Sequence, residues 1–196
     1  MSIAVIGTGR IGSTLGRALR RAGLEVVYGS RDPEAVTLAS DPGAEVVTVE
    51  QALSNAKTVV LAVPGTEVEG FLAKHGAALD GVLLVDAANK ITEPVIHSAA
   101  EAAQHAPGAR YARAFNTLGV ENLEEPEYEG VQGDLFFSCA EQDEDTVAGL
   151  IAAVGLRPIY LGPGQWTLLD EVLKIWYTLT LVGERGRRVG FKVLTD

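Results

Sequence analysis

The chain has 196 residues, a length that can bury a sizeable core and suits one domain with a small appendage. Its formal net charge is −10 at pH 7, which argues against nucleic acid or an anionic membrane as a partner because either would be repelled overall. Cys139 is the single cysteine. It cannot form an internal disulfide and lacks the neighbours of a metal site, so we expect a core residue and no bound metal.

The most informative stretch is an apolar run followed by spaced glycines. Residues 3–6 are expected to form a buried strand that opens onto Gly7, Gly9 and Gly12, spaced Gly-x-Gly-x-x-Gly. These glycines would allow a sharp turn, close approach to a pyrophosphate, and close packing of the next helix on the sheet. The helix amino terminus then offers free N–H groups to phosphates. The pattern predicts a dinucleotide-binding loop formed by Gly7, Thr8, Gly9, Arg10, Ile11 and Gly12.

The end of the second expected strand, residues 25–28, indicates which dinucleotide is favoured. NAD-binding domains usually place Asp or Glu about twenty residues after the glycines, where the carboxylate binds a ribose hydroxyl. This chain has Gly29, Ser30 and Arg31 there. A hydroxyl and a guanidinium suit a 2′-phosphate, so the pattern favours NADP. We expect Asp32 to cap the next helix, with an inward turn to a ribose hydroxyl as the alternative.

Further strands and helices alternate along the chain, as in a parallel sheet covered on both faces. We expect the remaining strands over residues 44–49, 58–63, 81–86, 110–115, 135–139 and 157–161. Helices are expected over residues 33–40, 49–53, 67–75, 92–104, 141–154 and 165–182, with a solvated loop over 121–129. The predicted fold class is α/β, a Rossmann-type doubly wound and mostly parallel sheet. A nucleotide-binding domain would cover residues 1–162 and a C-terminal helical appendage residues 163–196.

Ligands of such sheets lie across the carboxyl ends of the strands. We therefore expect Ala62, Val63 and Pro64, after the fourth strand, to lie beside the ribose or the pyrophosphate, a plain turn being the alternative. The polar segment 86–90 after the fifth strand, with Ala88 in it, and residues 116–119 after the sixth are also expected at this edge. His75, His97 and His105 are expected to be helix-end or surface residues rather than catalysts.

The expected helix over residues 165–182 is apolar around more than the stripe of about 100° that a surface helix needs. Asp170, Glu171 and Lys174 interrupt it, so we do not expect it to span a membrane. It would be covered by its own sheet and by a partner chain or a planar ligand, and a packing helix without a ligand role is the alternative. Because the first strand begins at residue 3, we expect no targeting segment before it and a cytoplasmic location.

With these motifs placed, the chain resembles the coenzyme F-420-dependent NADP oxidoreductase family over nearly its whole length. The Ala-Phe-Asn-Thr segment is also similar to the cytosolic domain of membrane metalloreductases, which pass hydride from NADPH to a flavin. The resemblance rests on Gly-Thr-Gly-Arg-Ile-Gly at 7–12, Gly-Ser-Arg at 29–31, Leu-Ala-Val-Pro at 61–64, Ala-Phe-Asn-Thr at 114–117, Gly-Leu-Arg-Pro at 155–158, Gly-Pro at 162–163 and Gly-Phe-Lys at 190–192.

The resemblance implies an NADP(H)-dependent oxidoreductase with a small flavin-like acceptor and does not choose that acceptor. We expect the deazaflavin coenzyme F-420 as the acceptor and a homodimer as the assembly. Thr8, Ser30 and Arg31 would hold the 2′-phosphate. Positioning, rather than an acid or a base, would supply the catalysis. The resemblance also implies backbone contact with the nicotinamide from Asn116, Thr117, Leu118 and Gly119.

Two departures from the family pattern bear on this implied function. Residues 32–41 contain no basic side chain, where family members can add a lysine, so preference for NADP over NAD would be weaker. Phe115-Asn116 differs from the corresponding segment of archaeal deazaflavin enzymes, so the acceptor stays open. A flavin or ferric reductase using FMN or riboflavin, and a non-catalytic NADP(H)-binding sensor, are the alternatives.

Overall fold

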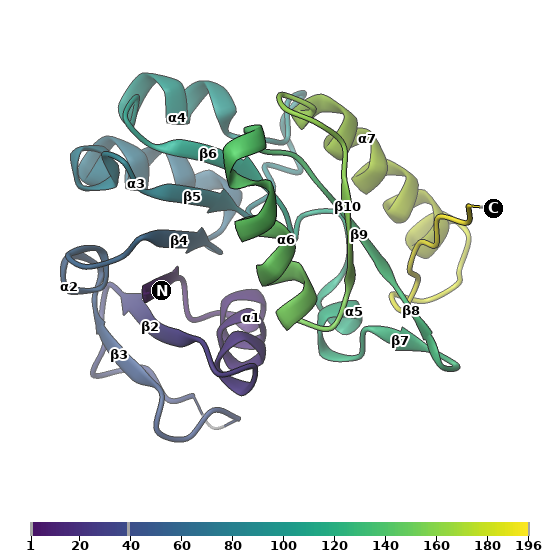
Figure 1. The fold of residues 1–196 in the computed structure, drawn as a ribbon, viewed down its shortest axis with the longest axis horizontal. Coiled ribbons are helices and arrows are strands. Elements are labelled where there is room, and N and C mark those ends of the chain that lie inside the picture. Colours follow the sequence, from purple (N-terminus) through teal and green to yellow (C-terminus); the bar gives the residue numbers. More distant parts are fainter. Residues whose placement is uncertain (1, 39, 196) are drawn as a thin grey trace.

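The computed structural model describes residues 2–38 and 40–195. A parallel sheet with strand order β3-β2-β1-β4-β5-β6 forms the left-hand half of the molecule in Figure 1. Its strands are β1 (Ser2–Ile6), β2 (Glu25–Ser30), β3 (Glu45–Thr48), β4 (Thr58–Leu61), β5 (Leu83–Asp86) and β6 (Arg110–Arg113). The chain winds from the middle to one edge and then to the other, so the winding reverses between β1 and β4. This confirms the predicted α/β fold with a Rossmann-type sheet.

The central strands form because their apolar side chains are buried on both faces of the sheet. Val5, Val60 and Val85 stand side by side on β1, β4 and β5 and belong to one apolar cluster. Their strand neighbours, among them Ala4 and Val59, belong to a second cluster on the opposite face. Alternation of successive side chains along each strand therefore builds two cores, one on each side of the sheet.

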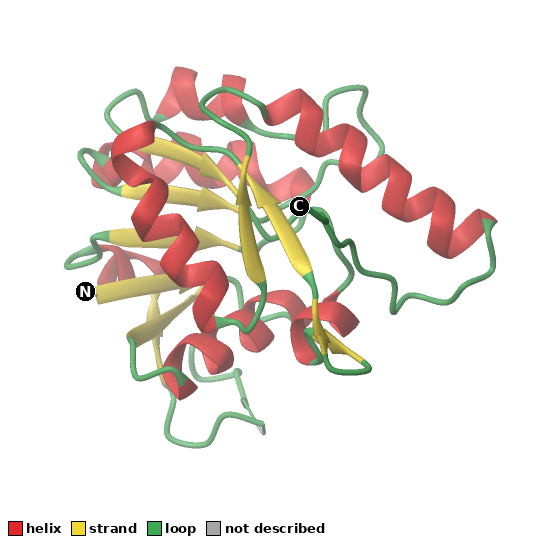
Figure 2. Ribbon diagram, turned by 45° about the vertical axis from the view of Figure 1, so that its right-hand side comes forward, coloured by secondary structure: helices red, strands yellow, loops and turns green. Residues whose placement is uncertain are grey.

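Helices cover both faces (Figure 2). Buried residues of α1, α6 and α7 lie in the first cluster, and buried residues of α2, α3 and α4 lie in the second. None of the helices that the structure describes is long and apolar enough to cross a membrane. The helices are α1 (Arg10–Arg21), α2 (Val49–Leu53), α3 (Val68–His75), α4 (Ala99–His105), α5 (Val120–Glu124), α6 (Glu144–Ala153) and α7 (Trp166–Tyr177), with shorter turns η1 (Gly65–Glu67), η2 (Gly76–Leu79), η3 (Glu141–Asp143) and η4 (Thr178–Val182).

Two small sheets lie beyond β6. Strands β9 (Asp134–Phe137) and β10 (Arg157–Tyr160) pair in parallel with each other, and an antiparallel bridge between Arg113 and Ser138 links them to β6. Strands β7 (Glu127–Tyr128) and β8 (Val131–Gln132) form a short hairpin. The prediction of a solvated loop over residues 121–129 is therefore wrong, because α5 and β7 occupy most of it.

The expected helix over residues 92–104 is also too long, since α4 begins only at Ala99. The preceding backbone N–H groups are used elsewhere: those of Ile96 and His97 donate to the Asp170 carboxylate, and that of Ser98 donates to Asp86. Two carboxylates from distant parts of the chain therefore hold this segment outside the helix.

No helix forms over residues 33–38, where one was expected; residue 39 lies outside the described part of the chain. The segment bends, and the Asp32 Oδ1 atom accepts a hydrogen bond of 3.4 Å from the backbone N–H of Ala35. Asp32 thus makes the local bond of a capping residue, but no helix follows it.

Apolar side chains on the outer side of the C-terminal helical segment remain exposed, among them Leu168, Ile175 and Val182.

Candidate functional site

The connection from β1 to α1 depends on two of the three spaced glycines. Gly7 has φ +110°, and a Cβ there would lie 2.4 Å from the carbonyl oxygen of Ala62. A Cβ on Gly12 would lie 2.0 Å from the carbonyl oxygen of Gly7. A Cβ on Gly9, in contrast, would meet no atom within 4 Å. The fold therefore requires Gly7 and Gly12, whereas Gly9 leaves open space at the start of the helix.

The amino terminus of α1 faces that open space without a capping side chain. Gly9 precedes the helix in an extended conformation, and no side chain of the described residues bonds the first N–H groups. The first turn of the helix carries no acidic residue. The first helical bond runs from the N–H of Ser13 to the carbonyl of Gly9. The N–H groups before Ser13 thus have no partner within the helix, and the helix dipole adds partial positive charge, which together suit an anion.

A cleft of about 620 Å³ opens at this edge of the sheet, and we call it the edge cleft. It runs across the carboxyl ends of β1, β2 and β4, between the glycine turn and α3. It is lined by Ile6, Gly7, Thr8, Gly9, Gly29, Ser30, Arg31, Asp32, Thr48, Val49, Glu50, Ala62, Val63, Pro64, Glu67, Gly70, Phe71, Lys74 and His75.

Eight of the residues assigned to cofactor binding from the sequence come together in the edge cleft: Gly7, Thr8, Gly9, Ser30, Arg31, Ala62, Val63 and Pro64. The others, Arg10, Ile11, Gly12, Ala88 and residues 116–119, lie outside it. Arg10 in particular points to α5, where its guanidinium contacts Glu121 at 3.1 Å and Glu124 at 2.9 Å. A role for these outer residues in cofactor binding stays a prediction.

Arg31 stands at the mouth of the cleft. Its side chain is 85% exposed, and its Nη1 atom lies 3.3 Å from Oε2 of Glu67, which belongs to the turn after β4. Ser30 accepts a hydrogen bond of 3.2 Å from the backbone N–H of Asp32 through its Oγ atom. The end of β2 thus presents a cation and a hydroxyl to the cleft, as the sequence predicted.

The opposite wall was missed by the sequence analysis. Lys74 on α3 contacts Glu50 on α2, with Nζ and Oε1 3.0 Å apart, and Phe71 packs against His75. Burial lowers the pKa of His75, the positive charge of Lys74 lowers it further, and Glu50 opposes the shift. These side chains meet only because α2 and α3 lie on the same face of the sheet, and no spacing in the sequence signals that.

The segment after β6 carries a strained backbone and unpaired polar groups. Phe115 has φ +63° although it is not glycine. The side-chain amide of Asn116 and the hydroxyl of Thr117 are buried and have no hydrogen-bond partner among the described residues. The backbone carbonyl of Asn116 accepts a bond of 3.0 Å from Nδ2 of Asn89. Buried polar groups without partners cost free energy, so they indicate a place where a ligand can supply one.

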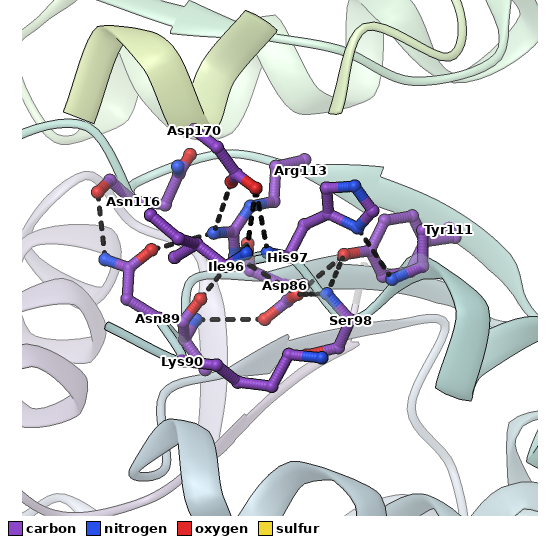
Figure 3. Close-up of polar contacts among 12 residues, drawn as sticks. Asp86, Asn89, Lys90, Ile96, His97, Ser98, Tyr111, Arg113, Asn116 and Asp170 are labelled. Atoms are coloured by element: carbon purple, nitrogen blue, oxygen red, sulfur yellow. Dashed lines mark hydrogen bonds and ion pairs between the residues drawn. The ribbon is translucent and has the colours of Figure 1, made fainter. Parts of the chain in front are cut away.

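A buried ionic network lies beside this segment (Figure 3). The guanidinium of Arg113 lies 3.1 Å from Asp86 and 3.4 Å from Asp170, and it donates to the backbone carbonyl of Ala88 and to Oδ1 of Asn89. Asp86 also accepts a bond of 2.6 Å from the hydroxyl of Tyr111. The network therefore joins the ends of β5 and β6 to α7.

Burial raises the pKa of the Tyr111 hydroxyl, and the charge of Asp86 raises it further. Burial also lowers the pKa of His97, which lies beside the network. The tyrosine thus stays protonated and the histidine stays neutral near pH 7. Both expected surface histidines, His97 and His105, are in fact half-buried.

Comparison with known proteins agrees with the fold. Residues 2–90 match the family described as NADP oxidoreductase, coenzyme F420-dependent. A glycerol-3-phosphate dehydrogenase [NAD(P)+] from Paracoccus denitrificans is 36% identical over 99 residues, which are 46% of this chain and 31% of that protein. The matched stretch thus spans about a third of that relative.

Among solved structures, one from Arthrobacter sp. FB24, described as a candidate F420-dependent NADP reductase, covers 100% of both chains with 25% identity and a TM-score of 0.85. A hypothetical protein from Sinorhizobium meliloti is 28% identical, with coverage of 85% and 87% and a TM-score of 0.73. An imine reductase from Streptomyces aurantiacus shares the fold at 21% identity and a TM-score of 0.72, over 91% of this chain and 61% of that one.

The family match and the full-length structural match confirm the resemblance read from the sequence motifs. This chain is therefore a Rossmann-type NAD(P)-binding oxidoreductase domain, and its residues 2–90 are similar to the coenzyme F420-dependent NADP oxidoreductase family.

Proposed function

We propose that this protein exchanges hydride between NADP(H) and a flavin-like acceptor, most simply the deazaflavin coenzyme F-420. The observation that carries the cofactor half is the uncapped start of α1, which opens at Gly9 onto the edge cleft that Arg31 also lines. The acceptor half is supported by the likeness to the Arthrobacter protein, because a candidate F420-dependent NADP reductase aligns with this chain along its whole length.

The edge cleft fits the parts of NADP(H) that a protein must hold. The open space at Gly9 and the free N–H groups of α1 suit the pyrophosphate. Ser30 and Arg31 offer a donor and a cation to the 2′-phosphate, with which a guanidinium forms strong charge-assisted hydrogen bonds. Residues 62–64 are small or apolar and allow the ribose and pyrophosphate to lie close to the end of β4.

When bound, NADPH supplies the hydride and the acceptor supplies the ring that receives it. The chain then has to orient the two and exclude water. The titratable groups near the end of β5 are already engaged, since Asp86 accepts hydrogen bonds from Ala88, Ser98 and Tyr111 and lies against Arg113. This supports catalysis by positioning, without a side chain as acid or base.

The test is NADPH oxidation by the purified protein, followed by loss of NADPH absorbance in separate anaerobic reactions with the deazaflavin, FMN, FAD and riboflavin. NADH is measured in parallel. Arg31→Ala is compared with Arg21→Ala, which removes an exposed arginine outside the edge cleft. We expect turnover with NADPH and the deazaflavin, loss of NADPH preference in Arg31→Ala, and unchanged kinetics in Arg21→Ala.

Other outcomes would identify a different function. Rapid turnover with FMN or riboflavin, and none with the deazaflavin, would make the protein a flavin reductase. Tight NADPH binding without reduction of any acceptor would contradict hydride transfer and favour a sensor. Equal effects of Arg31→Ala and Arg21→Ala would contradict the assignment of the 2′-phosphate site.

A further inference from the structure

The side chain best placed to bind a 2′-phosphate already has an anionic partner. Arg31 Nη1 lies 3.3 Å from Oε2 of Glu67, and both residues line the edge cleft. The two side chains are 85% and 51% exposed, so either can turn away into solvent without disturbing the core. A phosphate that binds Arg31 therefore competes with the Glu67 carboxylate for this guanidinium.

The backbone that carries Glu67 is fixed in place. The N–H of Glu67 donates to the carbonyl of Pro64 at 2.8 Å, which closes the turn η1. A Cβ on Gly65 would lie 2.3 Å from the carbonyl oxygen of Asn89, so this turn packs directly on the segment after β5. Val68, the next residue, is buried. The backbone of Glu67 is therefore held beside the mouth of the cleft, and only its side chain is free to turn.

The rest of the cleft does not compensate for this negative charge. Lys74, the other lysine or arginine that lines it, is held by Glu50 at 3.0 Å, and Asp32 adds a third carboxylate. Both of these cations are thus paired with acids, and the lining carboxylates outnumber them. A 2′-phosphate that binds Arg31 competes with the carboxylate of Glu67, whereas a dinucleotide without that phosphate does not.

We propose that Glu67 is a specificity-determining residue: it competes with the 2′-phosphate for Arg31 and thereby narrows the preference for NADP(H) over NAD(H). This inference rests on the cofactor site of the proposed function. NAD-binding domains present a carboxylate from the end of the second strand to a ribose hydroxyl. Here β2 ends at Ser30 and Arg31 follows it, and the carboxylate that lies against Arg31 comes from the turn after β4.

The experiment measures dissociation constants for NADPH and NADH by isothermal titration, without any acceptor. The variants are Glu67→Gln, Arg31→Ala, their double mutant, and Glu69→Gln as a matched control. Glu69 is exposed in the first turn of α3 but does not line the cleft. All three positions are on the surface, where such substitutions preserve folding.

We expect Glu67→Gln to lower the Kd for NADPH by about two- to tenfold, which is the range for freeing an exposed ion pair and removing a like charge. The Kd for NADH should stay within about twofold of wild type or rise. NADH has no 2′-phosphate, so the substitution removes only a carboxylate that could accept a hydrogen bond from its ribose hydroxyl. Glu69→Gln should change neither constant. In the Arg31→Ala background, Glu67→Gln should lose most of its effect on NADPH, because the two side chains act on one interaction.

Two results separate the possible failures. If Arg31→Ala leaves the Kd for NADPH unchanged, the 2′-phosphate site of the proposed function is wrong. If Arg31→Ala weakens NADPH binding but Glu67→Gln changes nothing, or tightens both cofactors equally, the cofactor site stands and the competition by Glu67 is overturned.

Discussion

Arg113 on β6 and Asp170 on α7 form a buried ion pair, with Nη2 and Oδ1 3.4 Å apart, although the residues are 57 positions apart in the sequence. The other carboxylate oxygen of Asp170 accepts hydrogen bonds from the backbone N–H groups of Ile96 and His97. One side chain of the C-terminal helix thus fixes both the end of the main sheet and the segment before α4 (Figure 3).

Removing the Asp170 carboxylate should therefore lower the free energy of unfolding far more than removing a neighbouring surface carboxylate. Asp170→Ala leaves two backbone N–H groups and part of the Arg113 guanidinium without partners, and breaking a buried pair costs about 3–5 kcal/mol. Asp170→Asn keeps acceptor oxygen and should cost less. Glu171→Gln, at an exposed position of the same helix, should stay within about 0.5 kcal/mol of wild type. Urea denaturation measures all three, and equal stability of Asp170→Ala and Glu171→Gln would contradict a stabilising role.

The sheet and its first turn could be predicted because their signals are local. Strand β4 reads Thr-Val-Val-Leu and is buried throughout, and the glycines at 7 and 12 stand where a Cβ would strike backbone. The start of α4 could not be predicted in this way. It depends on Asp170, which is 74 residues from Ile96 in sequence and reaches it only once α7 has packed.

The same distinction applies to the candidate site: some of its residues could be predicted from the sequence, and others could not. Ser30, Arg31 and residues 62–64 follow directly from strand ends, which meet at one edge of any parallel sheet. Glu67 and Lys74 lie within helical turns whose periodicity gives no hint that they face the cleft. Their contribution depends on how α2, α3 and η1 are rotated against the sheet, and that is set by packing of buried residues such as Val68 and Leu72.

Alanine substitution should affect Gly12 and Gly9 differently, because a Cβ meets backbone at Gly12 and open space at Gly9. Gly12→Ala places a methyl group against the carbonyl of Gly7, so the turn must shift and the protein should lose about 1–3 kcal/mol of stability. Gly9→Ala meets open space and should leave the melting temperature within a few degrees of wild type. It should nevertheless weaken NADPH binding at least about tenfold, because the methyl group occupies the place of a pyrophosphate. Unchanged affinity in Gly9→Ala would contradict the proposed location of the cofactor.

Stability should fall as pH drops below the usual histidine pKa of 6.5. Burial lowers the pKa of both His75 and His97 in the folded protein, so the unfolded chain binds more protons between the two values. Stability contributed by the neutral rings is then complete above pH 6.5 and is lost as pH falls through the lowered folded pKa. Denaturation between pH 8 and pH 5 measures this. His75→Gln and His97→Asn should each flatten the curve, and an unchanged slope in both would show that other groups cause it.

A substitution of Asn89 can disturb the segment after β6 without breaking the ion pairs of Arg113 with Asp86 and Asp170. Its Oδ1 accepts from Arg113 at 2.7 Å, while its Nδ2 donates to the backbone carbonyl of Asn116 at 3.0 Å. Asn89→Asp keeps the acceptor for Arg113 but loses the donor, so the protein should stay folded while the backbone of Asn116 shifts. If residues 116–119 contact the nicotinamide, hydride transfer should slow by about tenfold, the value of one hydrogen bond.

The binding of 2′,5′-ADP, which lacks the nicotinamide, separates this effect from general damage. Its affinity should be the same in Asn89→Asp and wild type, because the edge cleft is built from other residues. Asn89→Ala loses both bonds and should also reduce the melting temperature. Equal losses of 2′,5′-ADP binding and hydride transfer in Asn89→Asp would mean that Asn89 supports the fold as a whole. A slowed reaction with intact 2′,5′-ADP binding would assign it to positioning the segment after β6.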